Sequence, residues 1–192
     1  MKPNKLLITA VILYLNTGCM STLDKMAGVG QINTEISEFS GEKIVELSQS
    51  HNYSIKGKVN TQFGARWVSD NPESVSLKLI YNSDSSTGDA FTSYEGISVS
   101  ISGETIDFDA GRTYRNRSDY NDLTRVIYTT STAYVPIPLD YLKSMIEADN
   151  CKIRIYSSDG YEDISFDVEK NGSTEYSKLK IKRFIEEVER NK

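Results

Sequence analysis

The chain has 192 residues, of which 38% are hydrophobic and 26% are charged, and its formal net charge is −5. This balance is too apolar for a disordered chain and too polar for a membrane-embedded one, and the length fits one domain plus a targeting segment. The acidity favours solubility and argues against nucleic acid or anionic lipid headgroups as the main partners.

Residues 1–18 have the layout of a secretory signal peptide. Lys2 and Lys5 form a short positive region, Leu6–Leu15 is an apolar run, and Asn16–Gly18 supplies small or polar residues. At about 1.5 Å of rise per residue, this run spans about half of a hydrocarbon core of about 30 Å. The sequence therefore disfavours a permanent transmembrane helix. A buried N-terminal helix is the alternative, but it leaves the placement of the lysines unexplained.

The end of this segment, Thr17-Gly18-Cys19, resembles the lipobox of bacterial lipoproteins. In that family the cysteine thiol receives a diacylglyceryl group, the signal peptide is cut before it, and the new N-terminus is acylated. The resemblance implies that Cys19 is lipidated and anchors the protein to a membrane. Asn16 departs from the family pattern, which usually has an apolar residue there, so cleavage by the ordinary signal peptidase is the alternative. Met20 in place of an Asp implies the outer membrane, facing the periplasm.

The chain has two cysteines, Cys19 and Cys151. An oxidising compartment would permit a disulfide between them, whereas lipidation of Cys19 leaves Cys151 alone. Cys151 opens a run in which apolar residues alternate with polar ones. A free cysteine at such a position is typically a small buried hydrophobe.

Residues 19–42 contain Gly28, Gly30 and Gly41 among polar residues and few apolar ones. This composition predicts a flexible tether that follows the lipidated cysteine. We expect residues 43–192 to form one β-rich globular domain.

From residue 43 onward, apolar residues recur at every second position, which is typical of an antiparallel sheet with one buried face. Ser102–Glu104 and Ser158–Gly160 are typical of hairpin turns. The pattern predicts a mainly β fold, either a single antiparallel β-sandwich or a partly open barrel. The alternating runs are residues 63–67, 75–81, 97–101, 106–108, 126–128, 134–135, 153–155 and 164–168. The residues that we expect to face inward are Trp67, Leu77, Leu79, Val99, Ile153, Ile155 and Phe166.

Two segments have helical spacing instead. One helix is predicted near residues 139–148 and a C-terminal helix near 174–190, so the class is α+β with a dominant β part. Each apolar face could cover a sheet. The residues on these faces are Leu139, Leu142, Met145 and Ile146 in the first helix, and Leu179, Ile181, Phe184, Ile185 and Val188 in the second.

Two segments, 82–93 and 110–124, are predicted to be long polar loops, which in a compact domain are usually functional or disordered. The second concentrates arginine and tyrosine in an otherwise acidic chain. These two residue types are enriched where protein surfaces bind partners. The candidate partner-binding residues are Arg112, Tyr114, Arg115, Arg117 and Tyr120. A solvated loop without a binding role is the alternative.

No catalytic, metal or cofactor site is predicted. His51 is the only histidine, which removes most histidine-based catalytic arrangements and all multi-histidine metal sites. Asp107 and Asp109 are similar to the start of a calcium loop, but the other ligands are lacking. We therefore expect a non-catalytic domain of the cell envelope that binds an envelope protein or a small ligand, with no nucleic acid as partner. A structural or assembly factor of the envelope is the second reading, and a hydrolase of unusual type is the third.

Overall fold

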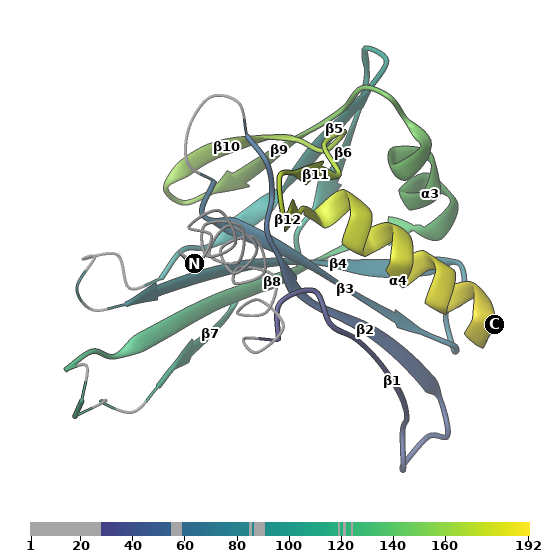
Figure 1. The fold of residues 1–192 in the computed structure, drawn as a ribbon. Coiled ribbons are helices and arrows are strands. Elements are labelled where there is room, and N and C mark those ends of the chain that lie inside the picture. Colours follow the sequence, from purple (N-terminus) through teal and green to yellow (C-terminus); the bar gives the residue numbers. More distant parts are fainter. Residues whose placement is uncertain are drawn as a thin grey trace, which may run out of the picture.

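The computed structural model describes residues 28–54, 59–84, 86, 91–118, 120, 122–123 and 125–192. Within these ranges the protein is mainly β, as predicted, with a curled half-barrel antiparallel sheet, smaller sheets and two helices (Figure 1). The predicted signal peptide and Cys19 lie outside the described residues.

The larger sheet is antiparallel and has the strand order β1-β2-β3-β4-β8-β7. Its longest pairing joins β4 to β8, from Ser74 opposite Pro138 to Asp84 opposite Tyr128. β1 and β7 are therefore the two edges of this sheet. The strands are β1 (Ile32–Ile36), β2 (Lys43–Ser50), β3 (Thr61–Val68), β4 (Ser74–Asp84), β7 (Tyr114–Arg117) and β8 (Tyr128–Pro138).

The second sheet has the order β10-β9-β5-β6, and β11 with β12 forms a separate small hairpin. Ser102 and Gly103 adopt positive φ between β5 and β6, and Gly160 does so between β9 and β10. Both predicted hairpin turns are thus confirmed. The strands are β5 (Tyr94–Ile101), β6 (Glu104–Asp109), β9 (Cys151–Ser157), β10 (Gly160–Ser165), β11 (Lys170–Asn171) and β12 (Thr174–Glu175).

One apolar core joins the two sheets and both helices. Period-two alternation directs every second side chain of each strand into it, as in β9, where buried and exposed residues alternate. The residues predicted to face inward are all buried, at 1% exposure or less: Trp67, Leu77, Leu79, Val99, Ile153, Ile155 and Phe166. The sequence pattern therefore identifies the core correctly.

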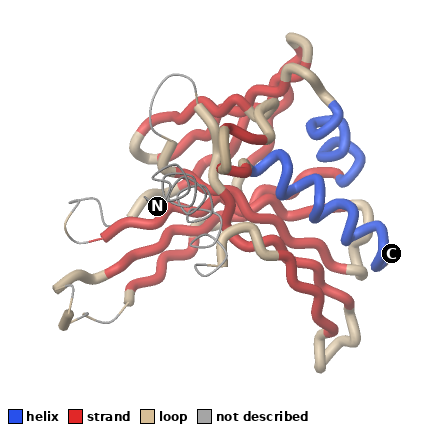
Figure 2. The backbone as a smooth tube through the Cα atoms, viewed as in Figure 1, coloured by secondary structure: helices blue, strands red, loops and turns tan. Residues whose placement is uncertain are grey.

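Both predicted helices are present, and they lie on the same side of the molecule (Figure 2). α3 (Leu139–Glu147) follows β8 directly, and α4 (Ser177–Asn191) packs over β2 and β3. The buried helical residues include Leu139, Leu142 and Met145 of α3, and Ile181, Phe184 and Val188 of α4. Each helix thus buries most of the face that its spacing predicts, while Ile146, Leu179 and Ile185 are only partly buried.

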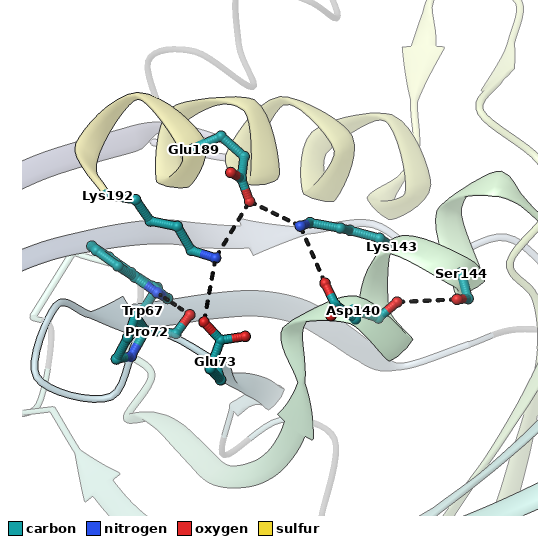
Figure 3. Close-up of polar contacts among 8 residues, drawn as sticks. All are labelled: Trp67, Pro72, Glu73, Asp140, Lys143, Ser144, Glu189 and Lys192. Carbon is teal, nitrogen blue, oxygen red and sulfur yellow. Dashed lines mark hydrogen bonds and ion pairs between the residues drawn. The ribbon is translucent and has the colours of Figure 1, made fainter.

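Charged side chains link the two helices at the surface (Figure 3). Lys143 of α3 lies 3.0 Å from Glu189 of α4 and 3.3 Å from Asp140. Lys192 lies 3.7 Å from Glu189 and 3.9 Å from Glu73, which precedes β4. Exposed ion pairs of this kind contribute little to stability. The packing of the two helices therefore depends mainly on their buried apolar faces.

Four segments differ from the expected organisation. Residues 82–84, predicted as loop, are the end of β4, and residues 174–175, predicted as the start of the C-terminal helix, form β12. Residues 32–36, which the composition places in the tether, form β1 and pair with β2. Residues 114–117, predicted as loop, form β7 and pair with β8. β1 and β7 are short edge strands whose side chains are mostly exposed. Period-two hydrophobic alternation marks strands that bury one face, so it misses strands of this kind.

Ile155 tests the assignment of β9 to the core. Its side chain is 1% exposed, and truncation in Ile155→Ala should lower the free energy of unfolding by about 2–5 kcal/mol through lost transfer energy and a cavity. Lys152→Ala on the exposed face of the same strand should change it by no more than about 0.5 kcal/mol. Denaturant titration measures both, and equal midpoints for the two variants would contradict this placement.

Glu175 predicts an acid dependence of stability. Its carboxylate accepts hydrogen bonds from Arg183 at 2.8 and 3.1 Å and from Lys180 at 2.7 Å. The hydrogen bonds from Arg183 contribute most, and together these contacts hold the pKa of Glu175 far below its usual range. A carboxyl group whose pKa is lower in the folded state stabilises the fold above its unfolded pKa of about 4.3, and that stability is lost as pH falls further.

Glu175→Gln should therefore lower stability at pH 7 and flatten the loss of stability below about pH 4.3. Glu186→Gln, a change at an exposed residue of α4, is the control and should leave the acid profile of the wild type intact. Thermal melts from pH 7 to pH 2 provide the comparison. If the stability of Glu175→Gln changes with pH in parallel with that of the wild type at all pH values, the contacts of Glu175 do not contribute to the pH dependence of stability.

Candidate functional site

The predicted arginine and tyrosine residues lie at the β7 edge of the larger sheet. Figure 1 shows β7 and the first part of β8 projecting away from the helices. All five residues are exposed: Arg112, Tyr114, Arg115, Arg117 and Tyr120. The structure gives most of them a strand rather than a loop as their support.

Strand alternation divides this group between two faces. Arg115 and Arg117 project to one face, where their guanidinium carbons lie 5.5 and 5.7 Å from the ring centroid of Phe91. Tyr114 projects to the other face, where it makes an edge-to-face contact with Tyr134 at 6.1 Å. Phe91 belongs to the first of the two predicted long loops, so the structure brings those two segments together.

A groove of about 620 Å³ runs beside β7. Arg115 donates a hydrogen bond of 2.6 Å from its guanidinium to Ser93 Oγ across this region. Arg117 and Tyr120 are not among its lining residues. Those residues are Ser93, Tyr94, Gly111, Arg112, Thr113, Tyr114 and Arg115. We call Arg112, Tyr114, Arg115 and Arg117, together with this groove, the β7 patch.

Hydrogen bonds fix the backbone around the β7 patch. The amide of Tyr94 donates to Thr113 Oγ1 at 3.0 Å, and the amide of Thr92 donates to Ser131 Oγ of β8 at 3.1 Å. The amide of Ser118 donates to the carbonyl of Tyr128 at 2.8 Å. Since hydrogen-bonded positions alternate along an antiparallel pair, the backbone groups of Arg115 and Arg117 face the free edge of the sheet.

The arginines of the β7 patch are not neutralised by any carboxylate of the described residues. Among the described residues, Arg112, Arg115 and Arg117 form no ion pair with a carboxylate. A guanidinium presents several planar donors that match carboxylate or phosphate oxygens. Toward the described part of the chain, the β7 patch can therefore bind an acidic group without first breaking a salt bridge.

A second polar surface was missed at the sequence level. Arg154, on the outer face of the smaller sheet, pairs with Asp163 through bonds of 2.7 and 2.9 Å and lies 4.3 Å from the ring centroid of Tyr161. Beside it is a depression of about 450 Å³ that also involves Lys152 and Tyr156. The alternation of β9 and the Asp159-Gly160 turn together could have identified this face, because they fix which residues point outward.

Residues with potential chemistry are dispersed. Cys151 is fully buried, and burial raises the pKa of its thiol to about 12, so the thiol is protonated at neutral pH. His51 is half-buried, with Nδ1 at 3.2 Å from Gln62 Nε2. Asp107 and Asp109 lie on the exposed edge strand β6. In the part of the chain that the structure describes, no group of acidic, histidine or cysteine side chains could hold a metal ion.

The comparisons with known proteins add no relative. No family model matches the chain, and no curated protein or solved structure matches it. Over the described ranges, no helix has the length and apolar character needed to cross a membrane.

Proposed function

We propose that this chain is a lipid-anchored, non-catalytic binding module of the cell envelope, and that the β7 patch captures an acidic partner. The anchor rests on Cys19, which follows Thr17 and Gly18 at the end of the apolar run. The binding role rests on one observation, three exposed arginines without an ion pair among the described residues, of which Arg115 and Arg117 lie on a paired strand.

A macromolecular partner fits this surface better than a ligand carried inside the sheet. Side chains of both sheets and of α4 fill the inner face of the curled sheet. The β7 patch is instead an open surface with exposed arginine and tyrosine, the residue types that contribute most to protein interfaces. An envelope protein with an acidic segment is therefore the favoured partner.

Binding also fits the residues better than catalysis does. Catalytic acids and bases usually have pKa values shifted by burial and close neighbours. Among the described residues no carboxylate is buried, and Lys178 is the one buried charged residue, donating to the carbonyl of Ala148 at 3.0 Å. The proposal therefore includes no enzymatic step and no cofactor.

The first test removes the charges of the β7 patch. Arg115→Ala with Arg117→Ala should leave stability within about 0.5 kcal/mol, since both residues are exposed. The same double variant should recover its envelope partner at about one tenth of the wild-type yield in crosslinking, because the pairing charges are gone. Lys152→Ala with Lys182→Ala removes the same net charge from other elements and should retain wild-type yield. Equal yields for both double variants would exclude the β7 patch as the binding surface.

The second test concerns the anchor. Cys19→Ala should release the protein from membranes into the soluble fraction, because the thiol that carries the lipid is absent. Met20→Ala keeps the thiol and should remain with the membranes. Intact-mass measurement of the mature protein from its native host should show the added acyl groups. An unmodified Cys19 in that protein would disprove lipidation.

A further inference from the structure

The hairpin between β1 and β2 presents bare apolar side chains at its tip. Phe39 is completely exposed, and Ile36 is 65% exposed. The turn is nevertheless ordered: the amide of Gly41 donates to the carbonyl of Ser37 at 2.8 Å, and the amide of Ser37 donates to the carbonyl of Glu42 at 2.8 Å. A large aromatic side chain held in water on an ordered turn is typical of an anchor for a partner.

Acidic residues flank Phe39 in the sequence. Glu35, Glu38 and Glu42 lie within four positions of Phe39, and none of them forms an ion pair with a described residue. We call residues 35–42 the acidic tip. Its chemistry fits a surface that has positive charges and aromatic rings, and it is repelled by an anionic lipid surface.

The β7 patch has the complementary chemistry. Its three arginines form no ion pair with a described carboxylate, and Tyr114, which lines the groove, is 60% exposed. Arginine stacks on aromatic rings and pairs with carboxylates, so it can meet both components of the acidic tip.

The acidic tip and the β7 patch are too far apart to meet within one molecule. β1 and β7 are the opposite edges of the larger sheet. The acidic tip also lies at the end of the sheet where Ser74 pairs with Pro138, whereas β7 pairs with β8 only from Thr132 to Thr129. At about 3.4 Å per residue, the offset from Pro138 to Thr132 places them about 20 Å apart along the strands. The hairpin tip and β7 also leave the sheet on different sides of the view in Figure 1. Contact between them requires two copies of the chain.

We infer that the acidic tip of one copy docks into the β7 patch of a second copy, so that the protein associates head to tail. The inference rests on the proposed function, because it names a second copy as an acidic partner of the same patch. Phe39 enters the groove against the guanidinium of Arg112, and the glutamates pair with Arg115 and Arg117. This contact is heterologous, so each copy keeps one free tip and one free patch, and association continues into a ring or a row.

Membrane anchoring favours this arrangement. Copies that are lipidated at the same N-terminal position share one orientation and diffuse in a plane. Tethering raises the effective concentration of one surface near the other, so a weak contact becomes populated. Head-to-tail contact between equally oriented neighbours needs no copy to turn over.

The experiment is sedimentation of the full chain in density-matched detergent, with reciprocal charge reversal. Wild type should associate as concentration rises, and high salt should weaken association because the paired charges are exposed. Glu38→Arg and Arg117→Glu should each weaken self-association by about tenfold or more, since each opposes like charges. An equimolar mixture of these two variants should associate again, because the reversed tip of one fits the reversed patch of the other. Glu186→Arg on α4 is the control and should associate as wild type does.

Phe39→Ser provides a second, charge-neutral test at the exposed tip, and it should weaken self-association by about tenfold as well. A wild-type chain that stays monomeric at all concentrations would overturn the inference, as would a mixture of charge-reversed variants that stays monomeric. Loss of vesicle binding rather than of self-association in Phe39→Ser would also overturn it and assign the tip to the membrane. The two proposals can fail separately. If wild type is monomeric but the Arg115→Ala, Arg117→Ala double variant loses its envelope partner, self-association is disproved and the proposed function is supported.

Discussion

The pairing of β4 with β8 is the interaction on which the rest of the structure depends. From Ser74 to Leu79, β4 pairs with the part of β8 that contributes to the core, and the buried side chains of both strands face the smaller sheet. From Ile80 to Asp84, the same pair continues along the margin of that core, where Ile80 is buried and Tyr81 packs against it, and carries β7 on its outer edge. The core therefore stabilises the part of the ladder that holds β7. The β7 patch is positioned by this part of the ladder rather than by a loop.

The same geometry separates two oppositely charged ends. The acidic tip concentrates glutamates that form no ion pair with a described residue, together with an exposed phenylalanine, at one edge, while arginines concentrate at the other. A molecule with a net charge of −5 thus has a strongly uneven charge distribution along one sheet. Short-range pairing at the basic edge is compatible with long-range repulsion of anions, because screening limits each charge to about 10 Å. Self-association would also connect the binding role with the alternative function considered from the sequence, that of an envelope assembly factor.

Local pattern predicted the parts of the fold that bury apolar side chains. Trp67, Leu77 and Ile155 were placed correctly because alternation alone fixes the buried face of a strand, and both helices followed from their spacing. The strand order could not be predicted, because β8 inserts between β4 and β7 through contacts distant in sequence. β1 and β7 were missed because exposed edge strands lack the alternation that the core imposes. The arginines were found by composition, but their shared contact with Phe91 depends on the fold.

The central claim is that β7 is held on β8 as a strand, and hydrogen exchange tests it most directly. The bond from the amide of Ser118 to the carbonyl of Tyr128 fixes which backbone groups of β8 face β7. By alternation, the amides of Thr130 and Thr132 point to β7, opposite Asn116 and Tyr114. Native-state exchange measured by NMR should show both amides strongly protected. Exchange of these two amides at the rate of an unstructured peptide, while the Leu79 and Val135 amides in the core stay protected, would contradict the account.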